Sequence, residues 1–221
     1  MIIVHHLNNS RSQRVLWLLE ELGVEYTIKH YLRDAKTKLA PPELKAVHPL
    51  GKSPVITDGD TVIAESGAII NYLIERYGKG RLIPAGGTPE RLRYDYWMHY
   101  AEGSLMPLLV MGLIMSFIPK RSPALIRPIA RGIVASVNKG YLGPNLKTHL
   151  AFVESELGKS NWFAGEELTG ADIQMSFPLE AAAVRGPAAD RPRSEAFLQR
   201  IHTRPAYQRA LQKGGPYELM R

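Results

Sequence analysis

The spacing of apolar residues changes once along this chain, near residue 78, and no other feature constrains the fold as much. Before that point, short β-rich runs alternate with helical stripes, whereas beyond it apolar residues recur only at helical spacing. Two strand–helix units followed by a hairpin are typical of a small mixed sheet covered by helices. The sequence therefore predicts an α/β plus all-α chain, with a first domain at 1–78, a linker rich in Gly and Pro at 79–88 and a helical domain at 89–221.

Individual elements follow from local patterns. Asp58-Gly59 between two apolar runs predicts a hairpin, Gly23 ends the first amphipathic stripe, and Pro205 breaks the last one. In the first domain we expect strands at 2–6, 26–32, 55–57 and 61–63, and helices over 15–22, 41–49 and 66–77. In the second domain we expect helices over 91–118, 146–157, 171–184 and 194–213 and no strand.

Composition excludes several classes of function. The chain of 221 residues contains no cysteine, so it has no disulfide, thiolate metal site or cysteine nucleophile. Its 28 Lys and Arg outnumber its 21 Asp and Glu and give a net charge of +7, but the basic residues are scattered and do not form a nucleic-acid-binding pattern. This excess favours anionic small ligands, and the absence of cysteine suits a reducing compartment.

The most apolar stretch runs from Leu105 to Ile118. It is shorter than the roughly 20 residues that span a bilayer, so we expect no transmembrane segment, and the first six residues lack the features of a signal peptide. A buried helix is the favoured interpretation. The alternative is an interfacial helix supported by the neighbouring basic residues Lys120, Arg121, Arg127 and Arg131.

Three motifs, correctly spaced along one chain, resemble those of the cytosolic glutathione S-transferases. The segments LGKSPVI (Leu50–Ile56) and ESGAIINYL (Glu65–Leu73) are similar to the paired glutathione-binding motifs, and NWFAGEELTGADI (Asn161–Ile173) is similar to the C-terminal folding signature. The opening HHLNNSRSQRVLWLLEEL resembles the bacterial and fungal branch that uses a hydroxyl or amide where other classes use tyrosine or cysteine. The resemblance implies a thioredoxin-like first domain, an all-helical second domain, a cytoplasmic homodimer and glutathione as co-substrate.

Such an enzyme must ionise a thiol that ordinarily titrates near pH 8.5. Lowering that pKa by about two units requires about 2.7 kcal/mol, which one hydroxyl hydrogen bond and a helix N-terminus can supply. Ser10 matches the family's serine when the chain is aligned on Arg14, so it is the candidate donor. Ser10 also fits an N-cap with Gln13 three residues later, a capping box with a purely structural role. Rival thiol partners in the same loop are Asn8, Asn9 and Arg11.

The resemblance also assigns glutathione-binding residues. Ser66 opens a predicted helix, where free backbone N–H groups favour an anion, and it would hold the γ-glutamyl carboxylate while Glu65 supports the amino group. The Ser53-Pro54 bond is predicted to be cis, leaving the Ser53 backbone free to pair with the cysteinyl unit. Lys52 would reach the glycyl carboxylate. Each of these residues also has a purely structural interpretation. Ser66 would be an ordinary helix cap, Pro54 a trans proline at the start of a strand, and Lys52 a solvated charge.

The electrophile site is expected on the helix at 91–118, across the domain cleft. Candidates there are Tyr96, His99 and Tyr100, although an aromatic stripe at this spacing more often forms core or dimer contacts. Asp172 completes a capping box with Thr169 and is assigned to folding. His5 and His6 point to opposite faces of a strand, and no metal site is predicted.

The sequence thus predicts a glutathione transferase that presents a thiolate to a hydrophobic electrophile, or reduces a hydroperoxide with glutathione. The alternative is a non-catalytic protein that binds glutathione or hydrophobic anions.

Overall fold

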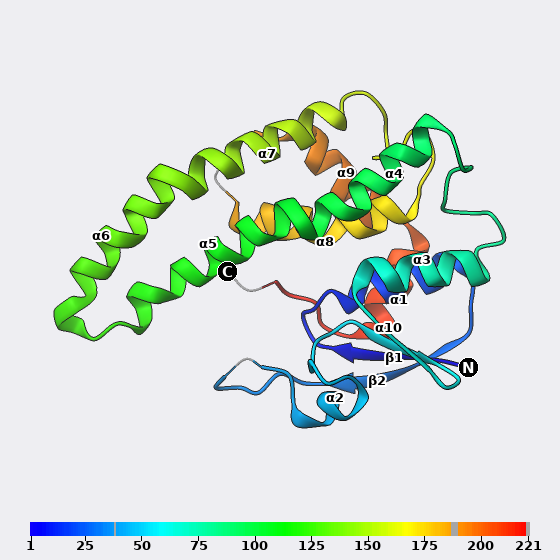
Figure 1. Ribbon diagram of the computed structural model, residues 1–221, viewed down its shortest axis with the longest axis horizontal. Coiled ribbons are helices and arrows are strands. Elements are labelled where there is room, and N and C mark those ends of the chain that lie inside the picture. The colour runs from blue at the N-terminus through cyan, green and yellow to red at the C-terminus, as the bar shows by residue number, and fades with distance from the viewer. Residues whose placement is uncertain (38, 187–189, 220–221) are drawn as a thin grey trace.

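A computed structural model of the chain describes every residue except 38, 187–189 and 220–221. A small sheet with its covering helices lies at one end (Figure 1), the remaining helices pack beside it, and a long helical hairpin projects away from both. The predicted division into a mixed α/β part and an all-helical part is confirmed.

The α/β part contains four strands in the order β2-β1-β3-β4. Strand β1 (Ile2–Leu7) pairs in parallel with β2 (Tyr26–Tyr31) and antiparallel with β3 (Val55–Asp58), which forms the predicted hairpin with β4 (Thr61–Ala64). The helices here are α1 (Ser12–Leu22), α2 (Pro42–Val47) and α3 (Ser66–Tyr77). Gly23 ends α1 with a φ of 69°, as its sequence position predicts.

Alternation along β1 gives the sheet two covered faces. Leu7 packs with Tyr31 of β2 and Leu44 of α2 on one face, whereas Val4 joins the main core beneath α1 and α3. The adjacent histidines follow the same alternation. His5 contacts Tyr31, and His6 faces the start of α1, so the expectation of opposite faces is confirmed.

The helical part begins at α4 (Pro89–Tyr100), which continues through a π-helical turn, η1 (Ala101–Leu105), into α5 (Met106–Arg121). A short 3₁₀ turn, η2 (Ala124–Ile126), leads to α6 (Arg127–Val137), and a second π-helical turn, η3 (Asn138–Leu142), leads to α7 (Gly143–Glu156). Then follow α8 (Gly170–Arg185), α9 (Pro192–His202) and α10 (Pro205–Gly214).

The last helix returns to the α/β part. Helix α10 lies along α1, where Tyr207 packs edge-on against Trp17 and Arg209 pairs with Glu20 at 2.7 Å. Burial opposes ionisation of Glu20, but Lys213, Arg209 and Tyr26 hydrogen-bond to it and keep its pKa below the ordinary value. Through these contacts with α1, helix α10 holds the helical part against the first domain.

The expectation that Leu105–Ile118 forms a buried helix is wrong for its second half. Leu105 and Leu109 are buried, but Ile114 and Ile118 are exposed, because α5 extends with α6 beyond the rest of the helical part (Figure 1). The continuous run Pro89–Arg121 is long and apolar enough to cross a membrane by length and composition alone, and 28% of its most apolar window is buried. Helix α6 was not predicted, because Pro123, Pro128 and Gly132 are residues typical of loops, although Ile129 and Ile133 recur at helical spacing.

Candidate active site

Ser10 lies in the turn between β1 and α1, and its hydroxyl is buried among other hydroxyls. Its Oγ is 2.7 Å from the Oγ of Ser12 and 3.2 Å from the Oγ of Ser53, which lies just before β3. Ser53 Oγ in turn donates to the carbonyl of His5 at 3.3 Å. The structure therefore brings together Ser10 and Ser53, two candidates that are 43 residues apart in sequence.

The hydroxyl chain ends on a histidine that was not assigned a role from sequence. Ser12 Oγ is 2.9 Å from Nδ1 of His6. Burial, and to a smaller extent the charge of His30, lower the pKa of His6 to about 4, although a hydrogen bond to the backbone of Gly214 opposes this. His6 is therefore neutral near pH 7. With its proton on Nε2 toward Gly214, its Nδ1 accepts the hydroxyl proton of Ser12.

The predicted capping box at Ser10 is wrong. Helix α1 starts at Ser12 with Arg11 as N-cap and no side-chain cap. The backbone N–H of Ser12 donates to Ser10 Oγ at 3.2 Å, whereas the side-chain amide of Gln13 is buried without a hydrogen-bond partner in the described part of the chain. Ser10 therefore supports the turn before the helix while its hydroxyl remains in the buried cluster.

The three rival thiol partners are engaged elsewhere. Asn8 Oδ1 accepts the backbone N–H of Arg33 at 2.9 Å. Asn9, whose φ is 51°, accepts the backbone N–H of Glu218 from the C-terminal tail at 2.7 Å. Arg11 donates to both carboxylate oxygens of Glu102 at 3.0 Å. Among these four loop residues, Ser10 alone directs its side chain toward Ser53.

A buried ion pair stands beside this loop. Arg14 is 1% exposed, and its Nη1 donates to Glu102 at 2.7 Å and to Gln174 of α8 at 3.1 Å. Burial lowers the pKa of Arg14, while Glu102 opposes that change. Burial alone would raise the pKa of Glu102, but the charges and hydrogen bonds of Arg14 and Arg11 outweigh burial and lower it. Glu102 occupies the π-helical turn η1, and such turns are frequent at functional sites.

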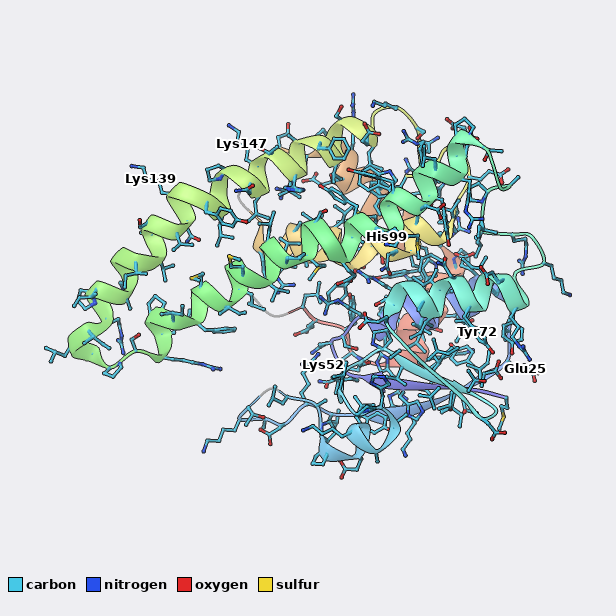
Figure 2. The ribbon with its side chains drawn as sticks, viewed as in Figure 1. Glu25, Lys52, Tyr72, His99, Lys139 and Lys147 are labelled. Atoms are coloured by element: carbon cyan, nitrogen blue, oxygen red, sulfur yellow. The ribbon has the colours of Figure 1, made fainter. Side chains whose placement is uncertain are left out.

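The predicted glutathione-binding residues lie on neighbouring turns. The Ser53-Pro54 peptide bond is cis, which confirms that prediction. Lys52 is exposed beside it, in the loop that leads into β3 (Figure 2). Ser66 is the buried first residue of α3. Glu65, at a φ of 70°, is exposed and makes no side-chain hydrogen bond or ion pair with the described residues. A left-handed φ at a non-glycine residue is uncommon and often accompanies a functional role.

The three aromatic candidates are not brought to this cluster. Tyr96 and Tyr100 stack on each other and pack against Phe152 of α7. Tyr100 is buried and lies 2.7 Å from Nδ1 of His149, and His99 is exposed on α4 (Figure 2). The residue of this helical run that faces the Ser10 loop is Glu102. The sequence pattern placed Tyr96 and Tyr100 on one face of the helix, but it did not show that this face packs against α7.

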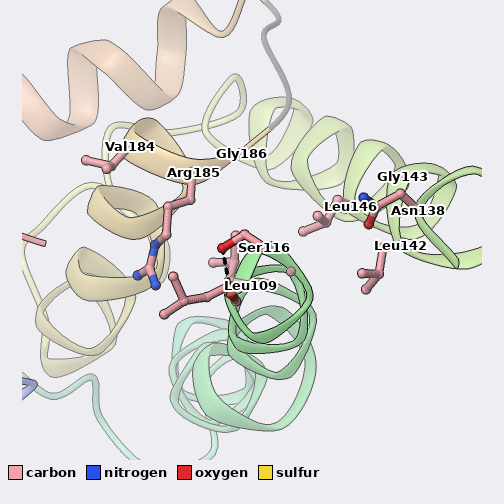
Figure 3. A pocket seen from close by; sticks show the side chains of 11 residues that line it. Leu109, Ser116, Asn138, Leu142, Gly143, Leu146, Val184, Arg185 and Gly186 are labelled. Carbon is pink, nitrogen blue, oxygen red and sulfur yellow. Dashed lines mark hydrogen bonds between the residues drawn. The ribbon is translucent and has the colours of Figure 1, made fainter. Parts of the chain in front are cut away.

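An apolar cavity of about 380 Å³ lies between α5, α7 and α8 (Figure 3). Leu109, Leu142 and Leu146 contribute to its lining, and Arg185 lies at its edge. Burial and, to a smaller extent, the charge of Arg11 lower the pKa of Arg185. A volume of this size suits a small hydrophobic molecule.

Asp172 is fully buried at the start of α8. Its carboxylate accepts the backbone N–H of Phe163 at 2.8 Å and of Thr169 at 2.7 Å, and the predicted capping box is present. Burial raises the pKa of Asp172 to about 6. Across the described part of the chain, no cluster of three or more His, Asp or Glu residues could hold a metal ion.

Comparisons with known proteins agree with this arrangement. Residues 1–75 match the family model of the glutathione S-transferase N-terminal domain, and residues 106–205 match that of its C-terminal domain. Glutathione S-transferase 3 of Schizosaccharomyces pombe is 38% identical over 82% of this chain and 74% of its own length. This chain belongs to the cytosolic glutathione S-transferase family.

Two further members of the family are similar over nearly the whole chain. Glutathione S-transferase 1 of Saccharomyces cerevisiae is 36% identical over 96% of this chain and 95% of its own length. A crystal structure of a glutathione S-transferase from Actinobacillus pleuropneumoniae is 37% identical, covers 97% of this chain and 93% of its own, and superimposes with a TM-score of 0.77. The similarity to named transferases favours the enzyme over the non-catalytic alternative.

Proposed function

We propose that this glutathione S-transferase activates its co-substrate with the hydroxyl of Ser10, which donates a hydrogen bond to the glutathione sulfur. The observation that carries the proposal is the 3.2 Å separation between Ser10 Oγ and Ser53 Oγ. Ser53 belongs to the motif that pairs with the cysteinyl unit of glutathione in this family, so a hydroxyl beside it is within reach of the cysteinyl sulfur.

The buried hydroxyl chain prepares Ser10 for this role. The backbone N–H of Ser12 already donates to Ser10 Oγ, and neutral His6 accepts the hydroxyl proton of Ser12. The Ser10 proton is then free to turn from Ser12 Oγ toward a thiolate. The N-terminus of α1 adds a favourable dipole at the same place.

The remainder of the tripeptide follows the neighbouring turns. Ser66 at the N-terminus of α3 would hold the γ-glutamyl carboxylate, and Glu65, which has no partner among the described residues, would meet the amino group. Lys52 would pair with the glycyl carboxylate. This assignment gives each charged end of glutathione a group of opposite charge or a set of N–H donors.

The electrophile would be held by the apolar cavity between α5, α7 and α8, because Tyr96 and Tyr100 pack against Phe152 of α7. The thiolate attacks the electrophilic carbon, a thioether forms and the leaving group departs, which is chloride in the case of chlorodinitrobenzene. With a hydroperoxide, the thiolate attacks the terminal oxygen and the alcohol leaves after protonation. A second glutathione then reduces the resulting sulfenic acid, giving the disulfide and water. We also propose a cytoplasmic homodimer with a first domain at 1–78, a linker at 79–88 and a helical domain at 89–221.

Replacement of Ser10 by alanine tests the proposal. A hydrogen bond to a charged group contributes about 1.5–3 kcal/mol, so the thiol pKa in the glutathione complex should rise by about one to two units. The pKa is measured from the pH dependence of kcat/KM with chlorodinitrobenzene, and turnover of cumene hydroperoxide is measured in parallel. Asn8→Ala, in the same loop, is the matched control and should leave the thiol pKa unchanged.

Two results would contradict the proposal. If Ser10→Ala lowers the melting temperature but keeps the thiol pKa, Ser10 serves only the turn. If the wild-type protein binds glutathione in calorimetry but turns over neither substrate, the non-catalytic alternative is correct.

A further inference from the structure

The α5–α6 hairpin, defined here as residues 110–137, is the most isolated part of the structure. It extends beyond the end of α8 and leaves its tip far from the sheet (Figure 1). The two helices pack on each other, and the buried residues of α6 are the small or medium side chains Ala130 and Val134. Most other hairpin residues are accessible to a partner.

The accessible surface of the hairpin is rich in large aliphatic side chains. Leu125, Ile129 and Ile133 recur at helical spacing, so together with Ile126 they form one stripe on α6 and the turn before it. These side chains and their counterparts on α5 are between 39% and 90% exposed; the full set is Ile114, Ile118, Leu125, Ile126, Ile129 and Ile133. Contiguous exposed apolar surface of this kind marks an interaction site more often than a free surface.

The charge of the same region has one sign. Between Glu102 and Glu154 the sequence contains no acidic residue. The basic residues of this interval make no ion pair with any described residue; they are Lys120, Arg121, Arg127, Arg131, Lys139 and Lys147. Lys139 and Lys147 point outward from the hairpin side of the molecule (Figure 2). At the tip, Lys120 and Arg121 lie over the ring of Phe117 and flank the apolar surface with positive charge.

The exposed aliphatic side chains and the positive charge together distinguish between two partners that could cover the hairpin, namely a second copy of this chain and an anionic lipid surface. Two copies of the hairpin that met through their tips would bring unpaired basic residues together with no acidic partner from either side. An anionic lipid surface offers both complements, since acyl chains accept the isoleucines and phosphate or carboxylate headgroups accept the lysines and arginines.

We propose that the α5–α6 hairpin docks peripherally on membranes that contain anionic lipids, with the aliphatic side chains inserted at the acyl boundary and the basic side chains among the headgroups. Leu113 and Ser116 of the hairpin also line the apolar cavity, so the docking brings this cavity towards a surface where hydrophobic electrophiles and lipid hydroperoxides concentrate. It does not depend on the catalytic assignment, because it rests on surface residues remote from Ser10.

The test is co-sedimentation of the full chain with vesicles of phosphatidylcholine alone or with 30% phosphatidylserine. The wild-type protein should bind the anionic vesicles and lose binding as salt rises, and it should bind neutral vesicles at least tenfold more weakly. Arg121→Gln with Arg131→Gln should weaken binding by about fivefold per charge. Leu125→Ser with Ile129→Ser should weaken it further, because insertion is lost.

Matched controls lie in the first domain. Leu32→Ser removes a leucine that is 73% exposed, and Lys36→Gln removes an exposed charge; both should bind vesicles like the wild type. All variants should retain glutathione turnover. The proposal is overturned if anionic vesicles are not bound, or if the hairpin variants bind as well as the wild type. It is also overturned if Leu125→Ser with Ile129→Ser halves the mass in solution, which would assign the hairpin to contact between copies.

Discussion

Replacement of Glu102 by glutamine removes the carboxylate that pairs with both Arg11 and Arg14. Arg14 is almost fully buried, and two of its nitrogens, Nε and Nη2, have no hydrogen-bond partner among the described residues. After the substitution, Gln174 remains beside Nη1 as a neutral acceptor. A buried guanidinium would then lack a compensating charge, which is the situation that makes the loss of one partner so destabilising.

The magnitude follows from burial. Breaking a buried pair by removing one partner costs about 3–5 kcal/mol. The Glu102 side chain is 31% exposed, so water can reach the vacated position and the lower end of this range applies. We expect Glu102→Gln to reduce the free energy of unfolding by about 3 kcal/mol. Arg11→Gln breaks the more exposed half of the cluster and should cost less than about 1 kcal/mol.

Urea denaturation followed by tryptophan fluorescence measures both variants. The double variant Arg14→Met with Glu102→Gln supplies the decisive comparison, because removing both charges should recover most of the loss. If Glu102→Gln costs less than 1 kcal/mol, or if the double variant is no more stable than the single one, the buried charge does not determine the effect and the reasoning is refuted.

Two further perturbations address the turn and the contact between domains. The pKa of His6 is about 4 in the folded chain and near 6.5 when unfolded, so its neutral form stabilises the fold above pH 6.5 and this contribution, about 3 kcal/mol at most, is lost as the pH falls to about 4. His6→Asn keeps an acceptor for Ser12 and should flatten the stability profile in that window relative to the wild type; an unchanged profile would exclude His6 as the titrating group. At Gly170, an added Cβ would lie 2.6 Å from Ile74, so Gly170→Ala should lower the free energy of unfolding by about 1–3 kcal/mol. Gly132→Ala, which meets no neighbour, should instead raise it by about 0.5–1 kcal/mol, and equal effects of the two substitutions on the urea midpoint would argue against the steric explanation.

Local signals predicted most of the elements. The Asp-Gly hairpin, Gly23 after α1 and the break at Pro205 all appear where the sequence places them. They were predictable because each depends on backbone preferences of one to four residues. The N-cap of α1 is Arg11, one residue after the Ser10 cap that the sequence offered as an alternative, because Ser10 with Gln13 satisfies the local capping pattern and only the buried contacts of Ser10 show its other role.

Contacts between segments that are distant in the sequence could not be predicted from local patterns. Tyr96 and Tyr100 share a helix face in the sequence, but the position of α7 decides that this face packs against Phe152. The apolar stretch in α5 was expected to be buried because composition reports hydrophobicity and not the number of neighbours.

Arg14 shows why site residues are hard to recognise from sequence when their role depends on burial. In the sequence it is one of 28 basic residues, and nothing in its neighbourhood marks it as buried. In the structure it joins α1 to η1 and α8 through Glu102 and Gln174, and it lies beside the loop that presents Ser10. A charge is placed in such a position only where several elements supply its partners, and those partners are 88 and 160 residues away. The position of the Ser10 loop is therefore a property of the assembled domains, and substitutions at Glu102 or Gln174 should alter the thiol pKa without touching glutathione.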